Sequence, residues 1–240
     1  MNRLAAIRIV LVGTRHPGNI GSSVRAMKTM GLTQLWLVAP EKFPHPDAIK
    51  MAAEAADLLA TVRIVETLDD AISDCSMAIA TSKRERGADW PALDINQTVD
   101  QLLENCATRN VALVFGPEPA GLTSADLYRC QYRSYLPTSE DCTSLNLAQA
   151  VQIYAYELLR AESRGLKPVP GPDLAPLAEL ELLYEHLLRV LVDLEFPRRN
   201  PEQLMLRVRT IFNRAGLIGR DLRLWRGILA RIEERIKTDR

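Results

Sequence analysis

Short, almost continuously apolar runs alternate with amphipathic stretches along the first two-thirds of the chain. The apolar runs, which are rich in β-branched residues and predict buried strands, are 6–12, 35–39, 62–65, 77–81, 111–115 and a weaker one at 132–137. The stretches with helical spacing are 20–31, 47–60, 68–73, 97–106, 123–129 and 145–164. Apolar strands separated by helices predict an α/β fold, a mostly parallel sheet with helices on both faces.

A proline-rich stretch at residues 167–176 ends this pattern. It can form neither a helix nor a central strand and is expected to be a semi-rigid linker. Beyond it, leucines recur at three- and four-residue steps from Leu177 to Leu194, which predicts an amphipathic helix. Two more helices are expected, one capped by Asn200 and one along 222–236. The chain is thus interpreted as an α/β domain at 1–166, a linker at 167–176 and a small basic helical domain at 177–240.

Composition narrows the class of protein. The 240 residues are 47% hydrophobic and 25% charged, an ordinary globular composition that excludes wholesale disorder. The apolar runs are too short for a transmembrane helix, and the first residues lack the successive charged, apolar and cleavage-site regions of a signal peptide. Three histidines and four widely spaced cysteines argue against a disulfide framework and against a metal site. We therefore expect a cytoplasmic protein without a membrane segment or a metal.

Charge is unevenly distributed, although the formal net charge is zero. Residues 197–240 carry 12 lysines and arginines against 5 acidic residues, and these basic side chains lie between the apolar stripes of the last helices. Such a region can hold a polyanion, or it can be the solvated face of a helix. Charge alone leaves both readings open.

A glycine-containing loop follows the first predicted strand, at residues 13–25. Asn19 and Ser22 are expected to cap the next helix, and with a helix start near Ile20 the side chain of Arg25 comes about one turn in and faces the loop. A loop of this kind that opens a helix can bind an anion, although neither a GxGxxG nor a P-loop motif is present. A capped turn with a surface arginine is the alternative.

Two more loops follow predicted strands. Residues 114–123 contain two glycines and two prolines around Glu118, and a polar run at 138–144 leads into the helical stretch that begins at 145. Because ligands bind at the carboxyl ends of parallel strands, we expect the three loops to meet around one site.

The three loops together resemble the signature motifs of a known superfamily. The motifs Asn-x-Gly-x-x-x-Arg at 19–25, Phe-Gly-x-Glu-x-x-Gly-Leu at 115–122 and Ser-Leu-Asn-Leu-Ala at 144–148 resemble, in order and spacing, those of the SPOUT methyltransferases. Three further stretches, 27–38, 80–91 and 226–233, are similar to the bacterial TrmJ branch (TrmH/TrmJ-like RNA 2′-O-methyltransferases). That branch methylates the ribose 2′-hydroxyl of cytidine or uridine at position 32 of the tRNA anticodon loop.

The resemblance implies a fold, a cofactor and partners. The α/β domain would end in a trefoil knot, which the usual topology rules do not predict. The methyl donor would be S-adenosyl-L-methionine, with S-adenosyl-L-homocysteine as the product, and the substrate would be tRNA. The protein would be a homodimer whose active site is completed across the interface.

The family's site residues carry over position by position. The implied cofactor contacts, largely through the backbone, are Thr81, Ser82, Lys83, Gly116, Leu136, Thr143, Ser144 and Leu145. The residues implied in catalysis are Arg25, supported by Asn19, Glu118, Ser144 and Asn146.

The role of Arg25 follows from its chemistry. A guanidinium has a pKa above about 12 and is a poor base. Our hypothesis is that Arg25 orients a phosphate and stabilises the developing alkoxide, while Ser144 relays the proton or water is the base. Glu118 has either a structural or a catalytic role.

Pro117 departs from the Gly-Arg-Glu pattern of many relatives and removes one phosphate contact. Lys83 and its basic neighbours can compensate, and no aromatic stacking platform is evident, so we expect RNA to be recognised by shape and backbone. The RNA-binding candidates are Arg84, Arg86, Arg207, Arg209, Arg214, Arg223 and Arg226. The alternatives are a related enzyme acting on rRNA or another tRNA position, and a non-catalytic RNA-binding protein.

Overall fold

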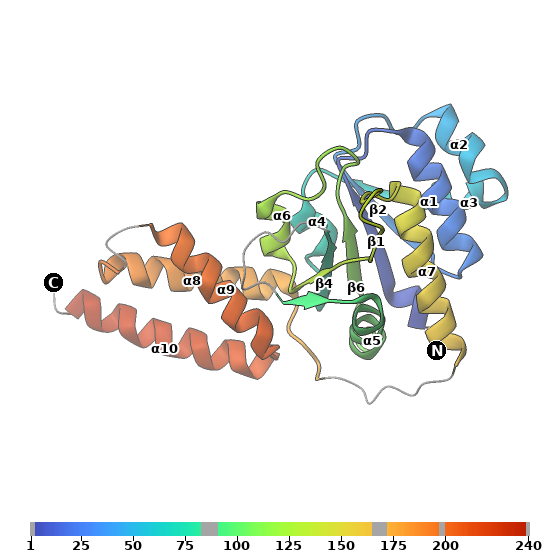
Figure 1. Cartoon of the computed structure of the whole chain (residues 1–240). Helices are drawn as coiled ribbons and strands as arrows, with labels where there is room; N and C mark the ends of the chain where they lie inside the picture. Colours follow the sequence, from blue (N-terminus) through green and yellow to red (C-terminus); the bar gives the residue numbers. More distant parts are fainter. Residues whose placement is uncertain (1–2, 83–90, 165–171, 197–199, 239–240) are drawn as a thin grey trace. The chain divides into compact units, whose positions relative to one another are not determined.

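The computed structural model describes residues 3–82, 91–164, 172–196 and 200–238. The chain forms two compact units, Met1–Gly171 and Pro172–Arg240, which are described separately (Figure 1). The first unit contains a seven-stranded sheet in the order β3-β2-β1-β6-β4-β7-β5, and every strand pair in it is parallel. The strands are β1 (Ile7–Val12), β2 (Gln34–Val38), β3 (Arg63–Val65), β4 (Met77–Thr81), β5 (Ala92–Leu93), β6 (Val111–Phe115) and β7 (Tyr132–Ser134).

The predicted parallel α/β sheet is confirmed, and its central strands show why the pattern is so apolar. All five residues of β6 are buried, and in β1 only Val12 is partly accessible, because helices cover both faces of the sheet. Two details differ from the expectation. The two-residue strand β5 is too short to leave a periodic signal, and β7 ends at Ser134, so that Leu136 lies in a loop.

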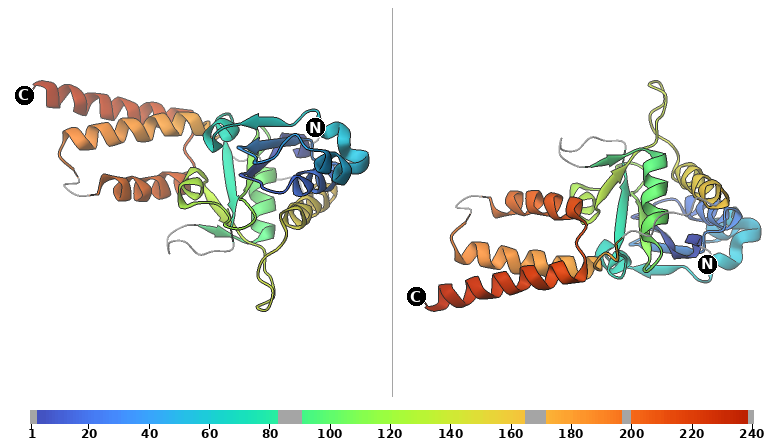
Figure 2. Two further views of the ribbon diagram at one scale, coloured as in Figure 1. Left: turned by 90° about the horizontal axis from the view of Figure 1, so that it is seen from above. Right: turned by 90° about the horizontal axis from the view of Figure 1, so that it is seen from below.

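Helices cover the two faces unequally (Figure 1, Figure 2). Helices α1 and α7 pack side by side on one face and α5 contacts α7, whereas α4 and α6 contact each other on the opposite face. The helices of this unit are α1 (Pro17–Thr29), α2 (Pro46–Ala52), α3 (Ala56–Leu59), α4 (Leu68–Ile72), α5 (Ile95–Asn105), α6 (Ser124–Arg129) and α7 (Leu147–Ser163), with short 3-10 turns at Arg3–Ala6 and Ala53–Ala55.

The helix expected over 47–60 is broken in the structure. Ala53 adopts a positive φ of 49°, so α2 stops there and α3 starts after a 3-10 turn. The break lies next to a close contact between α1 and α2, where a Cβ on Gly21 would come within 3.0 Å of the backbone of Ala48 and Ala52. Amphipathic spacing reports which face is buried and does not report such a local turn.

The second unit contains the three expected amphipathic helices, α8 (Leu177–Asp193), α9 (Pro201–Ala215) and α10 (Gly219–Thr238). Asn200 caps α9 as predicted, since its side chain accepts a hydrogen bond from the Gln203 N–H. An aromatic cluster joins the three helices: the ring centroids of Tyr184 and Phe212 are 6.2 Å apart, and those of Phe212 and Trp225 are 5.2 Å apart. In the part of the chain that the structure describes, we find no helix long and apolar enough to cross a membrane.

Arg209 does not lie on the basic outer face where the sequence placed it. Its side chain is 16% exposed and forms a bidentate ion pair with Glu181 of α8, and its guanidinium lies 4.4 Å from the ring centroid of Tyr184. Arg209 therefore belongs to the packing of this unit, and it is dropped as a candidate for RNA binding.

Replacing Glu181 with alanine is expected to lower the free energy of unfolding of the helical unit by about 1–3 kcal/mol, because the mostly buried Arg209 guanidinium loses its carboxylate. Chemical denaturation of the full chain measures this. The matched control is Glu234→Ala, which removes an exposed pair with Arg231 and should cost less than about 0.5 kcal/mol. If both variants lowered the free energy of unfolding equally, Arg209 would not be a packing residue of this unit.

Candidate active site

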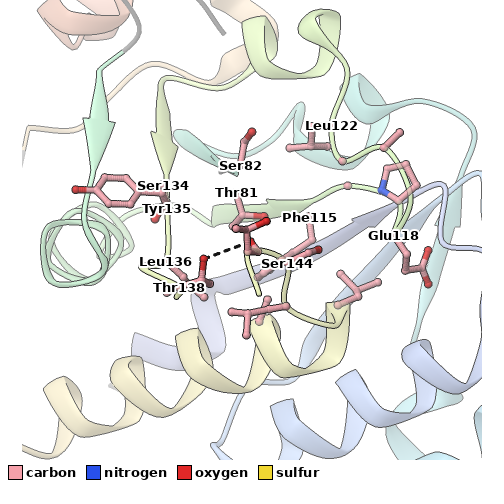
Figure 3. A pocket seen from close by; sticks show the side chains of 18 of the residues that line it. Thr81, Ser82, Phe115, Glu118, Leu122, Ser134, Tyr135, Leu136, Thr138 and Ser144 are labelled. Carbon is pink, nitrogen blue, oxygen red and sulfur yellow. Dashed lines mark hydrogen bonds between the residues drawn. The ribbon is translucent and has the colours of Figure 1, made fainter. Parts of the chain in front are cut away.

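A pocket of about 500 Å³ opens at the carboxyl ends of β4, β6 and β7 (Figure 3). Its wall is built from the loop after β6, the loop between β7 and α7, and the end of β4. The cofactor contacts expected from the sequence that line it are Thr81, Ser82, Gly116, Leu136, Thr143, Ser144 and Leu145. Lys83 lies outside the described residues. The structure thus brings together residues that are more than sixty positions apart in the sequence.

The loop after β6 closes tightly on itself. A Cβ on Gly116 would lie within 3.0 Å of backbone atoms of Gly121 and Leu122, so any side chain there would displace the loop. Gly121 has a φ of +67°, which favours glycine, and its N–H donates a 2.8 Å hydrogen bond to the carbonyl of Pro117. The glycines therefore create a backbone surface that a ligand can approach closely.

The loop between β7 and α7 supplies hydroxyl groups and a helix start. Thr138 Oγ1 donates to the carbonyl of Thr143 at 3.3 Å, and the N–H of Cys142 donates to Ser139 Oγ at 3.2 Å. Asn146 caps α7 by accepting hydrogen bonds from the N–H groups of Ala148 and Gln149. Ser144 is exposed at the pocket wall, where its hydroxyl is available to a ligand.

Sequence reasoning missed a hydroxyl chain behind this wall. Contacts of 2.6 Å link the Asp94 carbonyl to Thr98, Thr98 to Ser134, and Ser134 to Tyr154. A carbonyl only accepts, so Thr98 donates to Asp94, which leaves Ser134 as donor to Thr98 and Tyr154 as donor to Ser134. Burial raises the pKa of Tyr154 to about 12, so the phenol keeps its proton. The sequence carried no clear signal of this chain, since Ser134 stands in a three-residue strand next to Arg133.

Glu118 joins two of the predicted loops. Its carboxylate accepts hydrogen bonds from Asn19 Nδ2 at 2.7 Å and from the N–H groups of Arg15 and His16 at 3.1 and 3.4 Å. Burial opposes ionisation of Glu118, but these hydrogen bonds outweigh it and hold the pKa of the carboxyl below its ordinary value of 4.5. Glu118 is thus an ionised structural junction beside the pocket.

Asn19 extends the junction to the third loop. Asn146 Nδ2 donates to Asn19 Oδ1 at 2.9 Å, so Glu118, Asn19 and Asn146 form one hydrogen-bonded chain. The expectation that Asn19 and Ser22 cap a helix was wrong. Helix α1 starts earlier, at Pro17, and both residues lie inside it. Because proline at the first helical position has no N–H, this helix start has one fewer donor to cap. The side chain of Asn19 is therefore free to form the junction with Glu118 and Asn146.

Glu118→Gln is expected to weaken the junction, because an amide nitrogen would face a hydrogen-bond donor. Since the folded pKa is lowered, the charge stabilises the native state fully above pH 4.5, and this contribution is lost as the pH falls through the folded pKa. The difference in melting temperature between wild type and variant should therefore shrink toward acid pH. Thermal unfolding across that range measures it, and a constant difference would refute the role of the charge.

The structure does not bring Arg25 to the pocket of its own chain. Arg25 lies in the third turn of α1 and is exposed, and it is not among the described residues that line the pocket. Within the described residues, its guanidinium forms no ion pair or hydrogen bond. The earlier helix start, at Pro17 instead of near Ile20, explains the difference, because it puts Arg25 in the third turn and not about one turn from the loop.

The remaining RNA-binding candidates differ in how far the structure describes and exposes them. Arg84 and Arg86 lie outside the described residues. Arg207, Arg214 and Arg223 are exposed on the helical unit. Arg226 is partly buried and donates to the carbonyl of Glu179 at 3.3 Å. Among the residues with a described position, we find no group of three His, Cys, Asp or Glu side chains that could hold a metal ion.

Two family profiles match the chain. The profile of the SpoU rRNA methylase family matches residues 6–156, and the profile of the C-terminal domain of the tRNA methyltransferase TrmJ matches residues 178–240. The first match spans the pocket and all three predicted loops, and the second spans most of the helical unit.

Several characterised proteins and structures are similar over nearly the full length. The chain is 43% identical over 244 residues to the tRNA (cytidine/uridine/adenosine-2′-O-)-methyltransferase TrmJ of Pseudomonas aeruginosa strain UCBPP-PA14, covering 96% of this chain and 95% of that protein. It is 43% identical over 243 residues to the tRNA (cytidine/uridine-2′-O-)-methyltransferase TrmJ of Escherichia coli strain K12, covering 99% of each. The crystal structure of TrmJ from Z. mobilis ZM4 aligns with a TM-score of 0.81 at 32% identity, covering 94% of this chain and 98% of that chain.

Proposed function

The chain belongs to the SpoU methylase family, in its TrmJ group of tRNA ribose 2′-O-methyltransferases, and from this premise we propose that it methylates the 2′-hydroxyl of nucleotide 32, cytidine or uridine, in the tRNA anticodon loop. One arrangement carries the proposal: the loop after β6, the loop before α7 and the end of β4 line a single pocket, and Asn19 near the first predicted loop is hydrogen-bonded to both Glu118 and Asn146. With tRNA as the substrate, we expect the protein to act in the cytoplasm.

The pocket fits S-adenosyl-L-methionine. Its volume of about 500 Å³ suits a ligand of this size. Leu122, Leu136 and Leu145 offer apolar walls for a purine. Because Gly116 has no side chain, a ligand can come close to the backbone there. When bound, S-adenosyl-L-methionine supplies a methyl group already activated on a sulfonium. The protein's task is then positioning, which can contribute roughly 7–11 kcal/mol to lowering a barrier.

The acceptor side of the reaction calls for a second copy of the chain. A ribose hydroxyl must lose its proton, and Ser144 at the pocket wall can relay it to solvent water by giving up its own hydroxyl proton as it takes the ribose proton, or water can accept it directly. Arg25 would stabilise the developing negative charge, but it lies outside its own pocket. Helix α7, which packs beside α1, exposes the apolar side chains of Ile153 and Tyr156. We propose that a homodimer covers this surface and that Arg25 acts at the partner's pocket.

The RNA would be held mainly through its backbone. The sequence places Lys83, Arg84 and Arg86 directly after pocket residue Ser82, and the helical unit exposes further arginines. Several neutralised phosphates make binding fall steeply with salt concentration. The proposed RNA-binding set is Arg84, Arg86, Arg207, Arg214, Arg223 and Arg226.

The test is to incubate the purified protein with labelled S-adenosyl-L-methionine and bulk tRNA and to map the labelled nucleotide. A 2′-O-methyl group at position 32 is the expected result. A label at another tRNA position, or no label in tRNA but label in rRNA in a parallel incubation, would replace the proposed substrate with the alternative one. Binding of tRNA without binding of S-adenosyl-L-homocysteine, measured by calorimetry, would identify a non-catalytic RNA-binding protein instead.

A further inference from the structure

Tyr135 presents an exposed aromatic ring at the edge of the pocket. Three aromatic residues are among the described residues that line it, and Phe115 and Tyr154 are only 2% and 1% exposed, whereas Tyr135 is 39% exposed. Figure 3 shows Tyr135 on the β7 side, across the pocket from Glu118, with its hydroxyl directed away from the pocket centre. The ring therefore borders the pocket rather than filling it.

Hydrogen bonds and a neighbouring guanidinium hold the Tyr135 backbone and ring in place. The Tyr135 N–H donates to the carbonyl of Leu93 at 3.2 Å, which continues the pairing of β7 with β5. The guanidinium of Arg133 lies 5.7 Å from the centroid of the ring. Arg133 is itself 8% exposed, and its Nη1 donates to the carbonyl of Ser82 at 3.1 Å. A binding partner would thus meet a ring whose position is already set.

Arg133, the neighbour of this ring, is bonded to the two residues that flank a basic stretch of the sequence. The N–H of Arg133 donates to the carbonyl of Pro91, and its side chain to that of Ser82. These two partners bracket residues 83–90, in which the sequence holds Lys83, Arg84 and Arg86. An aromatic ring and basic side chains together bind unpaired nucleotides, since bases stack on the ring and phosphates pair with the cations. The described part of this combination is the exposed Tyr135 ring with the Arg133 guanidinium 5.7 Å from its centroid.

We propose that Tyr135 is the stacking platform for the nucleobase of the nucleotide that becomes methylated, an inference that rests on the proposed function. A loop nucleotide must leave its neighbours for its 2′-hydroxyl to reach the pocket, and a ring at the border offers the base a new partner. Stacking tolerates every base, because each has a π face. This accounts for the acceptance of cytidine and uridine without hydrogen bonds to a base edge.

A comparison of two RNAs tests the proposal. One is an anticodon stem-loop with cytidine at position 32, and the other carries an abasic ribonucleotide there, which keeps the 2′-hydroxyl. Wild type is expected to bind and methylate the abasic RNA about 5- to 150-fold less well, the range that corresponds to about 1–3 kcal/mol per stacked base. Tyr135→Ala should lose the same factor on the cytidine RNA and should treat the two RNAs alike. Tyr135→Phe should keep the discrimination.

The controls separate this inference from the proposed function. Ile64→Ala truncates a half-exposed side chain on β3, at the other end of the sheet, and should discriminate as wild type does. Affinities are measured with S-adenosyl-L-homocysteine present, so they do not depend on turnover. If Tyr135→Ala still preferred the cytidine RNA over the abasic RNA by the wild-type factor, the proposal would be overturned. If this variant lost affinity for S-adenosyl-L-homocysteine by as much as for RNA, the ring would be assigned to the cofactor. If wild type did not methylate the cytidine RNA, the proposed function would be rejected. The ratio of the affinities for the cytidine and abasic RNAs would still decide the role of Tyr135.

Discussion

Replacing Arg25 with alanine is expected to slow methyl transfer about 100- to 1000-fold and to leave the affinity for S-adenosyl-L-homocysteine within about twofold of wild type. The size of the effect is typical for loss of one group that stabilises developing oxyanion charge. Cofactor affinity should be preserved because Arg25 is exposed on α1, away from the described residues that line its own pocket. Single-turnover kinetics and calorimetry measure the two quantities separately.

The matched control is Arg15→Ala. The Arg15 side chain pairs with Glu41 at 2.8 Å on the surface, and only its backbone N–H contacts Glu118, so this variant removes a nearby guanidinium without breaking the junction. It should retain turnover within about threefold, because surface ion pairs contribute little. If Arg25→Ala lowered turnover and cofactor affinity by the same factor, the catalytic assignment would be wrong.

Gly116→Ala is expected to reduce S-adenosyl-L-homocysteine affinity about 5- to 150-fold, because the added methyl group would come within 3.0 Å of the backbone of Gly121 and Leu122 and force the loop outward. Overpacking of this kind typically costs about 1–3 kcal/mol. Calorimetry measures the affinity, and circular dichroism checks that the variant is folded. Gly18→Ala is the control, since its methyl group would meet only Met51 Cγ at an ordinary 3.5 Å. Unchanged affinity of Gly116→Ala would show that the cofactor does not use this loop.

Mixing the two impaired variants, at a cofactor concentration too low to load the Gly116→Ala pocket, tests the proposed dimer. A mixed dimer of Arg25→Ala and Gly116→Ala chains has one intact pocket, on the first chain, and one intact Arg25, on the second. If Arg25 acts at the partner's pocket, the mixture should regain up to about a quarter of wild-type activity, because half of the dimers are mixed and each has one complete site. If Arg25 acts within its own chain, the mixture stays inactive.

The amino-acid sequence by itself determined the α/β sheet, the three-helix unit and the loops that form the pocket. Strands such as Val111–Phe115 are apolar because both faces of the sheet are covered, and helices such as α8 repeat leucine because one face is buried. Burial leaves a local periodic signal, and that signal can be read without knowledge of distant contacts. The resemblance to a known family then pointed to the cofactor residues around Gly116 and Ser144.

Only the tertiary structure decided what the polar side chains do. Glu118 meets Asn19 across 99 positions, and Asn19 meets Asn146 across 127 positions. Arg209 turned inward to Glu181, although its neighbours in the sequence resemble those of the exposed arginines. A hydrogen bond depends on the position of two groups to within a fraction of an ångström, and no repeat in the chain encodes that position. The location of Arg25 outside its own pocket likewise follows from a helix that starts at Pro17, a few residues earlier than the motif alone implied.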